Sequence, residues 1–147
     1  ADKKESVLLN LMPEVNAEYA FDELYEKWNR LFDLRDDVMK ALELARASKL
    51  IGKSLDAKVT IYTTNDEYKT LFDSFASDLA TVFIVSQAFV KAENAPEGAF
   101  AETESGIAVL VEKADGHKCD RCWTYSTEGV HDEEGFICER CRKILAE

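Results

Sequence analysis

The sequence predicts an α+β fold: a long helix packed on a small three-stranded sheet with a second helix, plus a C-terminal zinc ribbon with four cysteine ligands. Three observations carry this prediction. Apolar residues recur at helical spacing over 21–42, short β-branched segments follow at 57–63 and 107–112, and four cysteines lie near the end. We expect residues 1–114 to form the α+β domain and residues 115–147 the zinc ribbon.

The long helix follows a lead-in of residues 1–20, in which Pro13 interrupts any helix. Gly52 suits its C-terminal end. Eight apolar residues share one face of this helix: Phe21, Leu24, Trp28, Leu31, Phe32, Val38, Met39 and Leu42. Arg35 falls within the same apolar stripe, so we expect it either to pair with a buried carboxylate or to meet an anionic partner.

The elements after the long helix are shorter. Residues 57–63 alternate and are rich in β-branched side chains, which predicts a strand. Residues 65–79 predict a helix with a polar N-cap. The apolar run 82–86 predicts a buried strand, with an extension to Val90 left open. An acidic loop, 92–105, then leads to a third strand at 107–112.

The cysteines form two Cys-x-x-Cys pairs, Cys119 with Cys122 and Cys138 with Cys141, separated by fifteen residues. This spacing is typical of a tetrahedral zinc site whose four protein ligands leave no position for water or substrate. We therefore predict one structural zinc ion. Iron bound by four thiolates stays open as an alternative, whereas two disulfides would require an oxidising compartment.

The charge of the chain limits its partners. With 18 basic and 29 acidic residues the formal net charge is −11, which argues against a general nucleic-acid binder. Residues 27–58 reverse the balance with eight basic and five acidic side chains, so any contact with a polyanion must be local. No apolar run, Val82 to Val85 included, is long enough to span a membrane, and no export signal is recognisable. We expect a cytoplasmic location and no membrane partner. Because the sequence begins with Ala1, we also expect it to be a piece of a longer protein.

The first cysteine pair displays two side chains that suit an unpaired nucleobase. The metal fixes the backbone that carries Arg121 and Trp123, and base–aromatic stacking contributes about 1–3 kcal/mol per base. The second pair adds three cations nearby: Arg140, Arg142 and Lys143. The alternative interpretation is that Trp123 only covers the small ribbon, which lacks a core of its own. No nucleophile–base arrangement is visible in the sequence.

Two motifs resemble bacterial isoleucyl-tRNA synthetases. Residues 35–46 have the form Arg-x-x-Val-x-x-Ala-Leu-Glu-x-Ala-Arg, and residues 49–57 have the form Lys-x-Ile-Gly-Lys-Ser-Leu-x-Ala. They are similar to the long helix of the family's anticodon domain and the strand after it. Residues 118–125, Lys-Cys-x-Arg-Cys-Trp-x-Tyr, and 138–141, Cys-x-Arg-Cys, are similar to its C-terminal zinc module. The resemblance runs from about Ser6 to the end.

The resemblance implies a class I aminoacyl-tRNA synthetase, which uses ATP to ligate isoleucine to its tRNA in protein biosynthesis. Residues 1–114 would be the C-terminal part of its stem-contacting, anticodon-binding domain, and Arg121 and Trp123 would touch the wobble base and its neighbour. The stem backbone would lie along three basic residues, Arg46, Lys49 and Lys53. The implied partners are isoleucine tRNA and the rest of the synthetase chain. DNA is not an implied partner.

The catalytic signatures of class I synthetases, His-x-Gly-His and Lys-Met-Ser-Lys-Ser, are absent from this sequence. We therefore expect the catalytic and editing sites to lie outside this chain. One alternative function is a protein-interaction module whose ribbon and acidic surface dock a basic partner without any RNA. Another is a finger of a DNA-repair glycosylase, which the net negative charge of residues 115–147 disfavours.

Overall fold

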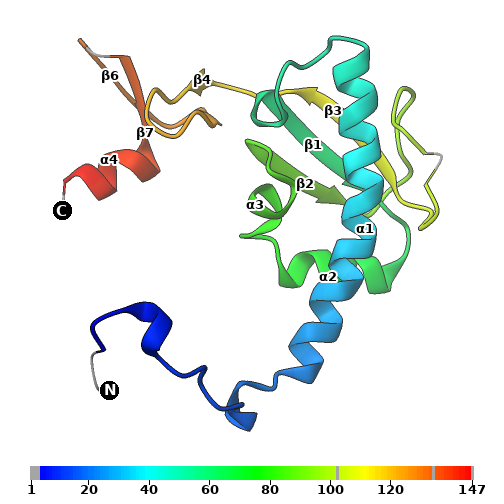
Figure 1. Ribbon diagram of the computed structural model, residues 1–147. Helices are drawn as coiled ribbons and strands as arrows, with labels where there is room; N and C mark the ends of the chain where they lie inside the picture. Colours follow the sequence, from blue (N-terminus) through cyan, green and yellow to red (C-terminus); the bar gives the residue numbers. More distant parts are fainter. Residues whose placement is uncertain (1–3, 102, 134, 147) are drawn as a thin grey trace.

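The computed structural model describes residues 4–101, 103–133 and 135–146 (Figure 1). Two single turns of 3-10 helix, Val7–Leu9 and Ala17–Tyr19, precede the long helix in the lead-in. The α+β part then contains α1 (Asp22–Ala47), a 3-10 turn (Ser54–Asp56), β1 (Ala57–Tyr62), α2 (Asp66–Ser74), α3 (Leu79–Phe83), β2 (Gln87–Lys91) and β3 (Ala108–Lys113). The ribbon contains β4 (His117–Lys118), β5 (Tyr125–Ser126), β6 (Gly129–Asp132), β7 (Gly135–Cys138) and α4 (Glu139–Leu145).

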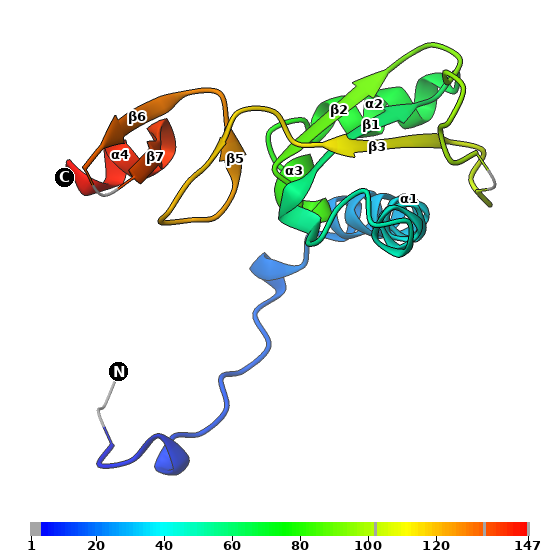
Figure 2. The ribbon, with the colours of Figure 1, turned by 90° about the horizontal axis from the view of Figure 1, so that it is seen from above.

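The three strands of the α+β part form a mixed sheet in the order β2–β1–β3. The central strand β1 pairs in parallel with β2 and antiparallel with β3. Figure 2 shows α1 end-on beside one face of this sheet. This arrangement confirms the predicted fold class, a long helix on a small three-stranded sheet. No helix in the described part of the chain is both long and apolar enough to cross a membrane.

The apolar stripe of α1 is buried only in its C-terminal part. Leu31, Val38 and Leu42 are fully buried against the sheet and the shorter helices. Three residues of the same predicted apolar face are exposed instead of buried: Phe21 by 59%, Leu24 by 49% and Phe32 by 48%. The prediction was wrong for Phe21 and Leu24 because the first turns of α1 extend beyond the sheet (Figure 1). Phe32 lies further along α1, next to the buried Leu31, and its half-exposed ring lies 5.7 Å from that of Trp28.

The helix ends at Ala47, five residues before the predicted end at Gly52. The chain turns at Lys49, whose φ is +61°, and the amide of Leu50 then donates to the carbonyl of Ala45 over 2.9 Å. Glycine is the usual residue at such a position, because a left-handed backbone costs other residues about 1–2 kcal/mol. Three described residues other than glycine have a positive φ: Lys49, Ile84 and Trp123.

The predicted strand is wrong over residues 82–86, whereas its extension to Val90 falls within β2. The chain forms α3 up to Phe83, reverses at Ile84 with φ +57°, and enters β2 only at Gln87. A short apolar run fits a buried helix as well as a buried strand, so periodicity alone does not separate them. Arg35 forms no ion pair with a carboxylate among the described residues: its Nε donates to the carbonyl of Val82 in α3 over 2.8 Å. Contact of Arg35 with an anionic partner stays a prediction.

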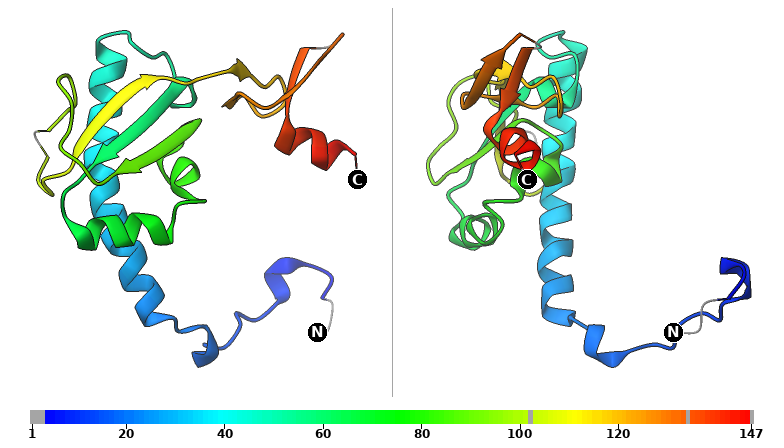
Figure 3. Two further views of the ribbon diagram at one scale, coloured as in Figure 1. Left: turned by 180° about the vertical axis from the view of Figure 1, so that it is seen from behind. Right: turned by 90° about the vertical axis from the view of Figure 1, so that its left-hand side faces the viewer.

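The zinc ribbon lies to one side of the sheet, connected through the end of β3 (Figure 3). Its buried residues form a small cluster of their own, Cys119, Phe136, Cys138 and Cys141, separate from the larger cluster around the sheet. The connecting segment is tied back to the α+β part. The amide of Ala114 donates to the carbonyl of Asp56 over 2.8 Å, and Lys58 Nζ lies 3.0 Å from a carboxylate oxygen of Asp115.

The N-cap of α2 provides a test of the helix boundaries. The Oδ1 atom of Asn65 accepts from the amides of Glu67 and Tyr68, over 2.8 and 3.4 Å. We expect Asn65→Ala to lower the free energy of unfolding by about 1 kcal/mol because these amides lose their partner. Urea unfolding followed by circular dichroism measures the change, with the neighbouring exposed variant Thr64→Ala as control. Equal stability of the two variants would contradict the assigned cap.

Candidate metal centre and the exposed tryptophan beside it

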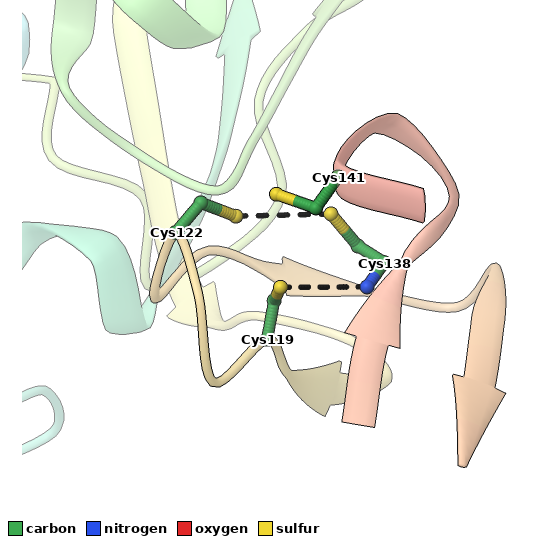
Figure 4. A group of neighbouring side chains, drawn as sticks. All are labelled: Cys119, Cys122, Cys138 and Cys141. Atoms are coloured by element: carbon green, nitrogen blue, oxygen red, sulfur yellow. Dashed lines mark hydrogen bonds between the residues drawn. The ribbon is translucent and has the colours of Figure 1, made fainter. Parts of the chain in front are cut away.

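Four elements of the ribbon bring the cysteines to one point. Cys119 and Cys122 lie in the knuckle between β4 and β5, Cys138 ends β7, and Cys141 lies in α4 (Figure 4). All four sulfurs lie within 4.8 Å of one another, and the Sγ atoms of Cys122 and Cys138 are 3.7 Å apart. Tetrahedral zinc with Zn–S bonds of about 2.3 Å requires sulfurs about 3.8 Å apart. The donors therefore fit the ion, and no disulfide joins these four free cysteines.

Backbone contacts hold the two knuckles together. The amide of Asp120 donates to the carbonyl of Phe136 over 2.9 Å, and the carboxylate of Asp120 accepts from the amide of Phe136 over 2.8 Å. Gly135 allows this approach, because a Cβ atom there would lie 2.1 Å from the Asp120 carboxylate. Phe136 is buried and supplies most of the apolar core of the ribbon.

Hydrogen-bond donors surround the sulfurs. The amide of Cys138 donates to the Sγ of Cys119 over 3.4 Å, and a hydrogen bond of 3.0 Å joins the Thr124 hydroxyl to the Sγ of Cys122. Interaction with the Cys122 sulfur raises the pKa of Arg140. Four thiolates around a divalent ion carry a net charge of −2, so these donors stabilise the loaded site.

The thiols do not ionise equally. Burial opposes ionisation of Cys122, but hydrogen bonds from the hydroxyl and amide of Thr124 lower its pKa to about 6. Burial, together with the bond to the Cys122 sulfur, raises the pKa of Cys138 to about 12. Neighbouring sulfurs thus share protons unless a cation neutralises them. The cluster is therefore a binding site for a thiophilic divalent cation, and its closed ligand set makes the ion structural.

Trp123 follows the first cysteine pair and points away from the metal-bound core. Its side chain is 59% exposed and does not belong to the buried cluster of the ribbon. Its backbone has φ +65°, and its amide donates to the carbonyl of Cys119 over 2.8 Å. The same turn is closed from the other side by the amide of Cys119, which donates to Thr124. The knuckle therefore presents a large apolar side chain to solvent on a strained backbone.

Two contacts set the position of Trp123 relative to the α+β part. The Nζ atom of Lys53 lies 5.9 Å from the centroid of the indole, within the range of a cation–π interaction. Two residues after Trp123, the amide of Tyr125 donates to the hydroxyl of Ser86 over 2.7 Å. That hydroxyl in turn donates to the carbonyl of Leu55. The structure thus brings together two of the predicted RNA-binding residues, Lys53 and Trp123.

The other predicted RNA contacts have different surroundings. Arg46 is ion-paired with Glu43 and donates to the Ser54 hydroxyl over 3.1 Å. Arg142 and Lys143 both pair with Glu139, which also bonds Arg142 through two oxygens at 2.7 Å. No ion pair of Arg121, Lys49 or Lys53 occurs among the described residues. RNA contact by any of these side chains remains a prediction.

Comparison with known proteins agrees with the site. Residues 116–144 match the family described as a zinc finger found in FPG and IleRS, which favours zinc over iron. The chain is 44% identical over 146 residues to the isoleucine–tRNA ligase of Caldanaerobacter subterraneus subsp. tengcongensis, a match that covers 97% of this chain and 16% of that protein.

The ligase of Listeria monocytogenes serotype 4b is 43% identical, with 96% of this chain and 15% of that protein covered. That of Bacillus cereus is 42% identical, with 98% and 16% covered. The resemblance to bacterial isoleucyl-tRNA synthetases is confirmed. The chain spans about one sixth of the length of these relatives. What it resembles in isoleucine–tRNA ligases is therefore one segment, and residues 116–144 of that segment form a zinc finger.

Sequence reasoning missed several residues that position the site. Asp120 and Phe136 link the knuckles, and Ser86 links the ribbon to the α+β part through Tyr125. These are single contacts between residues far apart in the sequence, and no local pattern indicates them.

Removal of zinc tests the site as a folding element. We expect chelation, or Cys138→Ser, to unfold residues from about Lys118 onward, because metal binding and folding of such a ribbon are coupled. The fluorescence of Trp28, which packs against Phe75 with ring centroids 4.6 Å apart, should persist, whereas that of Trp123 should change. Single-tryptophan variants, Trp28→Phe and Trp123→Phe, separate the two signals. Simultaneous loss of both would contradict this account.

Proposed function

We propose that this chain is the part of an isoleucine–tRNA ligase that binds the anticodon stem-loop of isoleucine tRNA. The observation that carries the proposal is the zinc-fixed, exposed Trp123 beside a basic helix end. A solvent-exposed indole on a rigid backbone suits an unstacked base, because every base offers a π-face for stacking. Arg121, also exposed and in the same knuckle, supplies a guanidinium for a base edge or a phosphate.

The exposure of Trp123 speaks against a purely structural role. The ribbon core is covered by Phe136, which is 6% exposed, so the indole is not required as its cover. A left-handed backbone also disfavours a bulky residue, and selection for stability alone favours glycine at this position. A side chain kept exposed on a strained backbone is characteristic of a functional site.

The two parts of the chain have different roles in this proposal. Residues 1–114 belong to the domain that contacts the anticodon stem, and residues 115–147 form the module that reaches the anticodon. The full ligase, a cytoplasmic enzyme, joins isoleucine to its tRNA with ATP at catalytic and editing sites outside this chain. The rest of that chain is the second partner. The net charge of −11 makes a role as a docking module for a basic protein the alternative outcome of the tests below.

Replacement of Trp123 tests the proposal. We expect Trp123→Ala to weaken binding of an RNA hairpin with the sequence of the isoleucine anticodon stem-loop about tenfold or more, since one base loses its stacking partner. Trp123→Phe should retain most of the affinity. The control is Phe89→Ala, which removes an aromatic side chain of similar exposure, 51%, from β2. Fluorescence anisotropy of labelled RNA measures the affinity.

Trp123→Gly separates function from stability. Glycine relieves the positive φ, so we expect the unfolding transition of the ribbon to stay unchanged or rise while RNA affinity falls. Arg121→Ala should weaken RNA binding and, in the full ligase, aminoacylation as well. If Trp123→Ala and Arg121→Ala both bind the hairpin like the unchanged protein, the assignment of the contacts is wrong. Capture of a basic protein partner by the same surface would then favour the docking module.

A further inference from the structure

A groove of about 600 Å³ lies between the C-terminal end of α1 and the first hairpin of the ribbon. Its lining includes Arg46 and Lys49 from the helix end, Lys113 from the end of β3, and Tyr125 from the ribbon. Asp56 is the acidic residue of the lining. The groove thus combines residues from three parts of the chain, next to the knuckle that carries Trp123.

The charges of this groove favour an anion. The lining has three basic side chains and one carboxylate, and that carboxylate already accepts from the amides of Gly52 and Lys53 over 3.2 and 2.7 Å. Of the three cations, Arg46 is paired with Glu43. In the described part of the chain neither Lys49 nor Lys113 forms an ion pair. Of the nine other lysines that the structure describes, five form ion pairs with carboxylates, as Lys69 does with Asp73 at 2.7 Å. Unpaired cations in an acidic protein are available to a ligand.

A second groove, on the other side of the contact between Ser86 and Tyr125, lacks this excess of positive charge. Its basic residues are Arg140 and Lys143, and its acidic residues are Glu128 and Glu139. Glu139 pairs with Lys143 at 3.8 Å, which neutralises one of these two cations. The balance of charge therefore directs an anionic ligand to the first groove rather than to the second.

The backbone of Lys49 provides an independent argument. Lys49 follows the end of α1 with φ +61°, where glycine would relieve the strain. Trp123 has the same kind of conformation, so two of the three strained non-glycine residues flank one surface. At both positions the chain keeps a large functional side chain at a cost in stability, which is characteristic of binding sites.

The groove and the indole are close enough to hold neighbouring nucleotides. Lys53, next to the lining residue Gly52, places its ammonium 5.9 Å from the centroid of the Trp123 ring. Tyr125, in the lining, is two residues from Trp123. We infer that this groove binds a backbone phosphate of the RNA nucleotide adjoining the base stacked on Trp123, through Lys49 and Lys113. The inference rests on the proposed function.

Two variants test this proposed phosphate-binding site of Lys49 and Lys113, called the phosphate seat below. Lys113→Ala and Lys49→Gly should each weaken binding of the anticodon hairpin about threefold or more and lower the slope of log affinity against log salt by about 0.7. Lys49→Gly should also raise the urea midpoint, because it relieves the positive φ, so its loss of binding cannot be due to unfolding. Lys69→Ala, on α2 away from the groove, is the charge-matched control and should change neither quantity.

A neutral phosphate identifies the contact directly. Hairpins that carry one methylphosphonate, placed in turn at each linkage of the anticodon loop, remove one negative charge at a time. We expect one linkage at which this change weakens binding to the unchanged protein but has no further effect on Lys113→Ala, since the two partners form one interaction. Independent effects at every linkage would overturn the phosphate seat.

The outcomes separate the two proposals. If Trp123→Ala weakens binding while Lys49→Gly and Lys113→Ala retain the affinity and the salt slope, the phosphate seat is wrong and the anticodon proposal stands. If the unchanged protein does not bind the hairpin, both are wrong. If all three variants weaken binding and the groove variants lower the slope, both are supported.

Discussion

The structure of this site depends on four thiolates that share one ion. The ribbon buries little besides Phe136 and the cysteines themselves, so apolar burial alone is too small to fold it. A structural zinc contributes an apparent binding free energy of about 10–16 kcal/mol. That is several times the cost of about 1–2 kcal/mol for a left-handed backbone at Trp123. The metal therefore allows an exposed indole on a strained turn, which an unsupported loop of this size would not hold.

The ribbon is positioned by a small number of polar contacts with the α+β part. The hydroxyl of Ser86 accepts a hydrogen bond from the amide of Tyr125. The carboxylate of Asp115 accepts from Lys58, and the amide of Asp115 donates to the side-chain oxygen of Gln87. These contacts place Trp123 next to Lys53. They also place Tyr125 beside Lys49 and Lys113 in one groove, and neither lysine forms an ion pair among the described residues. An acidic chain with a net charge of −11 thereby gains one local surface suited to a polyanion. Recognition depends on where the cations lie and not on their total number.

Much of the fold and the metal centre could be predicted from the sequence, because both depend on local patterns. The spacing of the cysteines predicted the zinc site, and β-branched alternation predicted β1 and β3. The errors arose where tertiary context decides: Phe21 and Leu24 match the helical period, but the first turns of α1 extend beyond the sheet. Val82 and Phe83 fit helix and strand equally well. The groove joins Lys49, Lys113 and Tyr125, which are far apart in the sequence, so no pattern could have indicated it.

Base stacking on a zinc-supported Trp123 is the central claim, and one fluorescence measurement tests it most directly. A hairpin with 2-aminopurine at each anticodon position in turn reports stacking as a loss of its emission. The account predicts quenching at one position on binding to the zinc-loaded protein, and no quenching once zinc is removed while the α+β part remains folded. Quenching that survives removal of the metal would contradict it.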